Sequence, residues 1–409
     1  MKSIVFFILL FLVSGLLIAA DAALKVTPNG YDYFKVRDGL SNCRAKFITE
    51  KKGRVAFMGG SITEMGISLT EGGSWRDIVM NDLKKRFPDT AFDFISAGIG
   101  SMGSTPHSFR FNRDILKNGP VDLLFIEAAV NDEGNGMSPK EMVRGMEGVV
   151  RHARLSNPNI DIIMMHFVDP SKMKVINEGK VPVVIEQHEK VAEYYSVPSI
   201  NMALEVTERI KAGEFDWHKD FKDLHPSSFG HAIYGRSIIR LFDQAWKEAS
   251  APKASLKACR CPDIPLDEKS YFKGKMVDLS SAVLSEGWQL VPDWKPEGNV
   301  STRKGFVNVP ALVSEKPGSI LRLKFEGTAV GIFVAAGPDA GIIEYSIDGQ
   351  PFESRNLFTN WSRQLHLPWA QILDGDLSMG SHELTLKVAE KSDPKSKGTA
   401  VRIMHLLVN

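Results

Sequence analysis

A serine that could act as a nucleophile follows two glycines at the end of an apolar run, in Val55-Ala-Phe-Met-Gly-Gly-Ser61. Glycine takes backbone angles closed to other residues, so Gly59 and Gly60 allow a sharp turn that presents Ser61 at the carboxyl end of a strand. Open α/β sheets bind their ligands at that end. A serine hydroxyl is a weak nucleophile until a neighbouring base takes its proton. Gly-Gly-Ser alone also fits a simple strand-to-loop turn, so the rest of the chain must supply the partners.

Three further segments carry the residue types that Ser61 would need. His225, in Asp223-Leu-His225-Pro, could take the proton, and Asp223 could hold the imidazole in the right tautomer and stabilise its charged form. The backbone N–H groups of Ser61 and Gly98 and the side-chain amide of Asn131 could stabilise the negative oxygen of a tetrahedral intermediate. Gly98 and Asn131 each follow an apolar run. The pattern therefore predicts acyl transfer by a Ser-His-Asp set with an oxyanion hole.

Alternating strands and helices would hold these residues at one edge of a sheet. The predicted order is strand 55–58, helix 74–87, strand 91–95, helix 106–116, strand 121–126, helix 138–155, strand 160–166, helix 183–195, strand 197–200, a helix to about 211 and helix 226–246. Such alternation is typical of a parallel sheet covered by helices on both faces. We therefore expect a three-layer αβα domain over residues 23–250.

The pattern changes beyond this domain. Residues 251–264 contain small residues and prolines and resemble a linker. Short alternating runs follow, and Asp348-Gly349 between two of them is a strong hairpin signal. We expect residues 265–409 to form a β-sandwich, either a carbohydrate-binding-like or an accessory domain.

The first residues have the layout of a secretory signal. Lys2 precedes an apolar stretch over 4–18, and small residues offer a cleavage site after Ala22. We therefore expect residues 1–22 to be removed and the mature protein to be secreted or periplasmic, with no membrane attachment. The formal net charge of +1 gives no reason to expect a nucleic-acid partner or an anionic membrane surface. The three cysteines, Cys43, Cys259 and Cys261, leave open one bridge from Cys43 or three free thiols.

The four segments together resemble, in order, the four blocks of the SGNH (GDSL-type) hydrolases, over about residues 50 to 247. The resemblance implies a flavodoxin-like sheet and ester hydrolysis without a metal or an organic cofactor. With the appended β-sandwich and the export signal, the chain resembles carbohydrate esterases that remove acetyl groups from polysaccharides.

Two positions depart from the family pattern. Gly60 stands where the family usually has an aspartate, as it does in polysaccharide-esterase-like members. Lys222 occupies the usual aspartate position three residues before His225, and Asp223 lies only two before it. Asp223 could reach the imidazole through altered loop geometry. Otherwise a backbone carbonyl or Asp220 would orient the ring.

The sequence thus predicts an exported serine esterase that removes O-acyl groups, and O-acetyl groups in particular, from a polysaccharide or oligosaccharide. Arg110 and Trp217 are candidate substrate-binding residues, although Arg110 also fits a solvated helix face. One alternative keeps the catalytic set but changes the ester, as in a methyl-esterase, a lipid esterase or an acyltransferase. Another is a carbohydrate-binding protein whose catalytic site has decayed.

Overall fold

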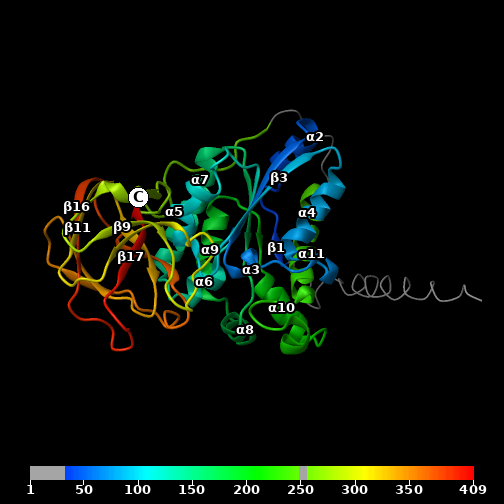
Figure 1. The fold of residues 1–409 in the computed structure, drawn as a ribbon. Coiled ribbons are helices and arrows are strands. Elements are labelled where there is room, and N and C mark those ends of the chain that lie inside the picture. The colour runs from blue at the N-terminus through cyan, green and yellow to red at the C-terminus, as the bar shows by residue number, and fades with distance from the viewer. Residues whose placement is uncertain (1–32, 248–255) are drawn as a thin grey trace, which may run out of the picture.

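The computed structural model describes residues 33–247 and 256–409, so the expected signal sequence at 1–22 lies outside the described residues. Figure 1 shows an α/β domain in blue to green beside a β domain in yellow to red. A parallel-sheet α/β domain followed by an antiparallel β domain confirms the predicted fold class.

The α/β domain is built on a six-stranded sheet with the order β1-β6-β5-β4-β2-β3. Its strands are β1 (Phe34–Lys35), β2 (Lys52–Gly59), β3 (Ala91–Gly98), β4 (Leu123–Glu127), β5 (Asp161–Met165) and β6 (Ser199–Ile200). Strands β2 to β6 pair in parallel, and β1 adds an antiparallel edge. The carboxyl ends of β2, β3 and β4 therefore share one rim.

Helices cover both faces of this sheet. They are α2 (Ser41–Thr49), α3 (Ser61–Glu64), α4 (Trp75–Arg86), α5 (Ser104–Asp114), α6 (Ala129–Gly134), α7 (Pro139–Ser156), α8 (Pro170–Asn177), α9 (Val183–Tyr194), α10 (Met202–Lys211) and α11 (Ser228–Trp246). In Figure 1, α4 and α11 lie on one side of the sheet, and α5 and α7 lie between the sheet and the β domain. None of the helices in the described parts has the length and apolar character needed to span a bilayer.

The strand sequences explain why both faces are covered. Alternate side chains of a strand point to opposite faces, and every side chain of β4 is buried. Phe57 and Phe125 belong to the core under α4 and α11, whereas Met58 and Ile126 belong to the core under α5 and α7. The continuous apolar runs that predicted these strands are thus shared between two separate cores.

The β domain consists of two antiparallel sheets packed on a shared core. Its strands are β7 (Lys275–Val277), β8 (Ala282–Leu284), β9 (Gln289–Trp294), β10 (Val309–Ser314), β11 (Ile320–Gly327), β12 (Val330–Ala336), β13 (Ile342–Ile347), β14 (Glu353–Asn356), β15 (Leu367–Asp374), β16 (Gly380–Val388) and β17 (Val401–Val408). The predicted hairpin at Asp348-Gly349 joins β13 to β14, with both residues at positive φ.

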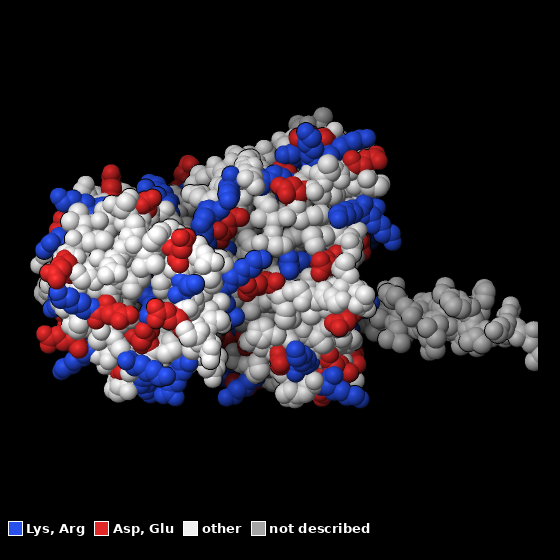
Figure 2. Space-filling view, in the orientation of Figure 1, with Lys and Arg blue, Asp and Glu red and all other residues white. Residues whose placement is uncertain are grey.

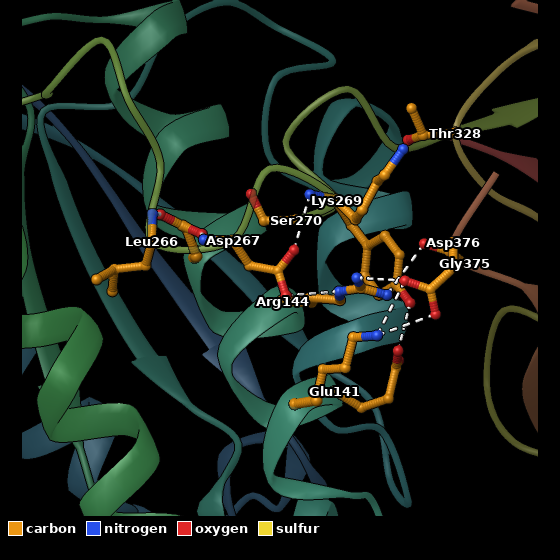
Figure 3. Close-up of polar contacts among 12 residues, drawn as sticks. Glu141, Arg144, Leu266, Asp267, Lys269, Ser270, Thr328, Gly375 and Asp376 are labelled. Carbon is orange, nitrogen blue, oxygen red and sulfur yellow. Dashed lines mark hydrogen bonds and ion pairs between the residues drawn. The ribbon is translucent and has the colours of Figure 1, made fainter. Parts of the chain in front are cut away.

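The segment that connects the two domains is fastened along α7 (Figure 3). The Glu147 carboxylate accepts hydrogen bonds from the N–H groups of Leu266 and Asp267, at 2.5 and 2.9 Å. The buried Arg144 donates to Asp267 at 2.9 Å and to Asp376 of the β domain at 2.7 Å. One helix of the α/β domain therefore holds both the connection and the second domain.

The cysteines are free thiols in the structure. Cys43 is buried on α2, and Cys259 and Cys261 are partly buried in the connecting segment. The Cys43 main-chain N–H donates to Asp161 at 2.7 Å, and the Cys259 thiol donates to the Ile160 carbonyl at 3.2 Å. Of the two possibilities left open by the sequence, the structure has the free thiols.

Candidate active site

Ser61 lies where the sequence predicts, at the turn between β2 and the short helix α3. Gly60 is the residue before the helix, and Ser61 is its first residue. The Ser61 hydroxyl oxygen lies 2.8 Å from Nε2 of His225, within hydrogen-bonding distance. Two residues far apart in sequence thus meet in the geometry that a serine nucleophile and its base require.

His225 is carried by a loop between a single π-helical turn, η2 (Trp217–Phe221), and α11. Lys222 follows that turn and has φ +92°, a backbone conformation that residues other than glycine rarely adopt. Such strain is often found where a structure must hold a functional group in place. The strained residue stands at the position where the family usually has its aspartate.

Asp223 contacts the main chain of His225. One carboxylate oxygen of Asp223 accepts a hydrogen bond from the His225 N–H at 2.6 Å. Asp220 is turned away, because its carboxylate accepts from the N–H of Asp216 at 2.8 Å. Within residues 33–247 and 256–409, no carboxylate forms a hydrogen bond with the Nδ1 atom of His225. Asp223 thus shapes the loop, and its direct action on the imidazole stays a prediction.

Asn131 reaches Ser61 through a contact with Gly60. It lies in α6, directly after β4, and its Nδ2 atom is only 2.0 Å from the place where a Cβ atom on residue 60 would stand. Real Cβ atoms essentially never have a neighbour under 3.0 Å. Any side chain at residue 60 would therefore displace the amide, which explains the glycine at this position.

Gly98 does not face Ser61. It pairs with Gly59 at the end of β3, the edge strand, and the N–H of the next residue, Ile99, bonds to the Gly59 carbonyl at 3.0 Å. Successive residues of a strand direct their N–H groups to opposite sides, so the Gly98 N–H points to the free edge. Its Cα packs instead under the backbone of α3, at Glu64. This placement does not fit an oxyanion donor.

Gly103, five residues further on, lies closer to the other donors. A Cβ atom on Gly103 would stand 2.0 Å from Oδ1 of Asp132, the residue that follows Asn131. In the described parts of the chain, the N–H groups of Ser61 and Gly103 and the Nδ2 atom of Asn131 have no protein acceptor. Buried backbone N–H groups are nearly always paired, so an unpaired one at buried Gly103 indicates a place for a ligand oxygen.

The two candidate substrate-binding residues are both part of the protein interior. Arg110 is 0% exposed, and its guanidinium donates to His107, Asp114 and the Ala97 carbonyl. Neither a substrate contact nor a solvated helix face fits that position. Trp217 is 8% exposed and stacks on Phe221 within the core, with ring centres 4.9 Å apart. Both side chains are thus enclosed by partners within the protein.

A buried carboxylate lies beneath the rim. Glu127 is the last residue of β4, and its Oε1 accepts from the Val130 N–H at 3.1 Å, at the start of the helix that carries Asn131. Burial raises the pKa of Glu127 to about 7, although the hydrogen bond from Val130 works in the opposite direction. Glu127 therefore makes a buried polar contact with α6.

The β domain supplies an arginine to the same rim. Arg303 Nη2 donates to the Ser101 hydroxyl at 3.2 Å, and its guanidinium carbon lies 2.9 Å from the place of a Cβ atom on Gly100. Pro368 and Trp369 of β15 also border the loop that contains Ser101. Nothing in the sequence pattern indicates Arg303 or Pro368, because they reach the site only through the packing of the two domains.

A cleft of about 1030 Å³ runs between the domains, from Glu64 and Gly98 on one wall to Lys304 and His405 on the other. Figure 2 shows side chains of both charges along this boundary. His405 Nε2 lies 2.8 Å from Nη1 of Arg113 across the cleft. Burial and the neighbouring Arg113 lower the pKa of His405 to about 4, so its neutral ring accepts the hydrogen bond.

Comparisons with known proteins concern the family of the first domain and the fold of both domains. Residues 57–233 match the model of the GDSL-like Lipase/Acylhydrolase family. The crystal structure of a two-domain esterase (CEX) active on acetylated mannans matches with a TM-score of 0.71 and 21% identity, over 90% of this chain and 95% of that chain. The same esterase co-crystallised with mannopentaose matches with a TM-score of 0.69 and 20% identity, over 90% and 94%.

Other matches are shorter. The acetyl xylan esterase AlAXEase matches with a TM-score of 0.38 and 18% identity, over 46% of this chain and 98% of that chain. The comparison with curated proteins gives no match. The family match confirms the predicted SGNH (GDSL-type) resemblance for residues 57–233, which form a GDSL-like lipase/acylhydrolase domain. The structural match shows that the fold is shared along both domains, with an antiparallel β domain after the first.

Proposed function

We propose that this chain is an exported serine esterase that removes O-acyl groups, O-acetyl groups in particular, from a polysaccharide or oligosaccharide. The observation that carries the proposal is the 2.8 Å contact between the Ser61 hydroxyl and His225 Nε2. Nearby are three hydrogen-bond donors that have no acceptor among the residues that the structure describes. The acetylated mannans on which the similar two-domain esterase is active support the choice of a carbohydrate ester. The expected signal sequence supports a secreted or periplasmic location.

The reaction follows from these positions. His225 takes the proton of the Ser61 hydroxyl as the oxygen attacks the ester carbonyl. The N–H groups of Ser61 and Gly103 and the amide of Asn131 stabilise the negative oxygen, with Gly103 in the place first expected for Gly98. The C–O bond to the sugar then breaks, and His225 returns the proton to the leaving sugar hydroxyl. A water molecule, deprotonated by His225, releases the acyl group as a carboxylic acid and restores Ser61.

Asp223 has a more limited role in this proposal. Its hydrogen bond to the His225 N–H fixes the loop, and its charge favours the imidazolium that forms during the reaction. The catalytic set is then a Ser61-His225 pair supported by Asp223.

Replacing the nucleophile tests the proposal. We expect Ser61→Ala to lower kcat on p-nitrophenyl acetate by at least about a thousandfold and to abolish labelling by a fluorophosphonate probe. Ser68→Ala is the matched control, because Ser68 is exposed and, within the described part of the chain, its hydroxyl forms hydrogen bonds only with Thr70. A Ser61→Ala protein with undiminished turnover and labelling would refute the assignment.

The substrate class needs a separate experiment on the wild-type protein. We expect acetate release from acetylated plant and algal glycans to exceed methanol release from methylated pectin and hydrolysis of long-chain esters. Preferential release of methanol or of a long-chain acid would keep the catalytic set but replace the acyl group in the proposal. A folded wild-type protein with no turnover and no probe labelling would instead identify a carbohydrate-binding protein with a decayed site.

A further inference from the structure

A buried polar cluster joins the loop after β3 to the turn after β4, directly behind the proposed oxyanion hole. Asp132 is its centre and has no exposed surface. Oδ1 of Asp132 accepts from the Ser104 N–H at 2.7 Å, and Oδ2 accepts from the Ser104 hydroxyl at 2.6 Å. Oδ2 also lies 2.9 Å from Nε2 of His188 on α9. One carboxylate therefore connects three segments of the domain.

His188 acts as a donor in this cluster. Its ring is fully buried, and in the part of the chain that the structure describes its Nδ1 atom has no hydrogen-bond partner. A proton on Nδ1 would be buried without an acceptor, whereas one on Nε2 has Asp132 as its acceptor, so Nε2 carries a proton and donates it to Asp132. Asp132 thus accepts from one N–H, one hydroxyl and one imidazole. A carboxylate provides the acceptor sites that all three require.

The cluster lies between two of the proposed oxyanion donors. Ser104 directly follows Gly103, and Asp132 directly follows Asn131. The backbone of Gly103 packs on the Asp132 carboxylate so closely that a Cβ atom there would stand 2.0 Å from Oδ1. The bonds of Asp132 to Ser104 therefore fix the distance between the Gly103 N–H and the Asn131 amide. His188 prevents the carboxylate from rotating away.

We infer that Asp132 and His188 are positioning residues for the esterase reaction, acting through Gly103 and Asn131 without touching the substrate. This inference rests on the proposed function. Oxyanion donors contribute to turnover only when they meet the position of the developing charge. Disturbing the cluster will consequently lower kcat more than it changes KM, whereas a cluster that only supports the fold would change stability alone.

Exchanging the carboxylate for an amide tests the first residue. Asp132→Asn keeps the size of the side chain but places an NH₂ group against donors, so at least one of the three hydrogen bonds is lost. A donor displaced by about 1 Å costs on the order of a hundredfold in rate. We expect kcat on p-nitrophenyl acetate to fall about 10- to 100-fold, with KM within about threefold of the wild-type value.

A pair of substitutions at His188 separates positioning from bulk packing. The terminal NH₂ group of glutamine can take the place of the Nε2–H, so we expect His188→Gln to retain kcat within about threefold. His188→Leu has similar volume and no donor, and we expect it to lose about tenfold or more. Ser108→Ala is the matched structural control, because this buried hydroxyl on the same helix as Ser104 bonds to the Gly145 carbonyl at 2.6 Å.

Urea unfolding of each variant shows which fraction is folded at the assay temperature. The inference is overturned if Asp132→Asn and His188→Leu, both folded, keep kcat within twofold of the wild type. It is also overturned if His188→Gln loses as much turnover as His188→Leu. Failure of the proposed function would look different, because Ser61→Ala would then retain activity and probe labelling.

Discussion

Adding a single methyl group at residue 60 disturbs the proposed oxyanion hole with little change elsewhere. In Gly60→Ala the new Cβ atom would stand 2.0 Å from Nδ2 and 3.3 Å from Cγ of Asn131. The backbone at Gly60 has φ −84° and ψ −152°, an extended conformation that alanine tolerates. The nearest other neighbour, the Met102 carbonyl oxygen, is 3.7 Å away. The strain therefore falls on one side-chain amide.

The size of the effect follows from the distances. Contacts under 3.0 Å are essentially never tolerated, so the Asn131 amide must move by at least about 1 Å. Rotation of a short side chain is cheap for the fold, and we expect the free energy of unfolding to change by less than about 1 kcal/mol. A displacement of about 1 Å costs on the order of a hundredfold in rate, equivalent to about 2.7 kcal/mol of activation free energy.

The assay is steady-state hydrolysis of p-nitrophenyl acetate, with urea unfolding of the same preparations. We expect kcat of Gly60→Ala to fall about a hundredfold, with little change in KM. Gly66→Ala is the matched control, because no atom lies within 4 Å of the Cβ position on that residue. Asn131→Ala alone removes the donor and lowers kcat by about 10² to 10³.

The double variant decides the mechanism. If the methyl group acts through the amide, Gly60→Ala adds little once Asn131 is already alanine, so the two effects are strongly non-additive. Two results would refute the reasoning. One is a Gly60→Ala protein whose kcat stays within threefold of the wild type. The other is full additivity, because the methyl group would then act on the Ser61 turn instead of on Asn131.

Three further predictions concern the surroundings of the site. Because Asp223 accepts a hydrogen bond from the main chain of His225, we expect Asp223→Ala to lower kcat only about tenfold. A decrease in kcat of about 10⁴-fold would show that Asp223 acts on the ring as a triad carboxylate does. Burial raises the pKa of Glu127 from 4.5 to about 7, so the contribution of its protonated form to the free energy of unfolding, fully present below pH 4.5, is lost as the pH rises towards 7, by roughly 3 kcal/mol. Between pH 5 and pH 8, the free energy of unfolding in urea should therefore depend less on pH in Glu127→Gln than in the wild type. An unchanged pH dependence would contradict this. Arg303 reaches the rim at Ser101 without contacting His225. Arg303→Ala should therefore raise KM on acetylated oligosaccharides about tenfold and leave kcat on p-nitrophenyl acetate within twofold of the wild type. An equal decrease in kcat on both substrates would assign Arg303 to the chemical step.

The sequence predicts the framework well because each strand carries its own signal. The apolar run 121–126 is buried on both faces of the sheet, so it is predicted as a strand by its continuous apolar residues, without alternation of polar and apolar side chains. Ser61 and His225 are predicted because a glycine-flanked strand end and a loop before a helix are local features. The parallel topology brings Ser61 to the rim, and the loop before α11 places Nε2 of His225 within 2.8 Å of its hydroxyl.

The oxyanion donor could not be predicted from its neighbours in the sequence. Gly98 is the last residue of β3 and Gly103 lies in the loop that follows, but both belong to one glycine-rich stretch of the sequence, which does not distinguish them. The difference comes from the pairing of β3 with β2, which points the N–H of Ile99 towards Gly59 and that of Gly98 away from it. Which backbone group faces the nucleophile is thus fixed by strand register, and register depends on a partner strand far away in the sequence.

The position of the Arg110 side chain likewise depends on elements that pack against its helix. Its helical spacing allows a solvated face, and an arginine is rarely buried without partners. The α5 helix, however, packs against α7 on one side and β7 of the second domain on the other, and Asp114 lies one turn along to accept the guanidinium. The β domain that packs on α5 also brings Arg303 to the rim, at Ser101. That placement of Arg303 arises only when the two domains have packed together.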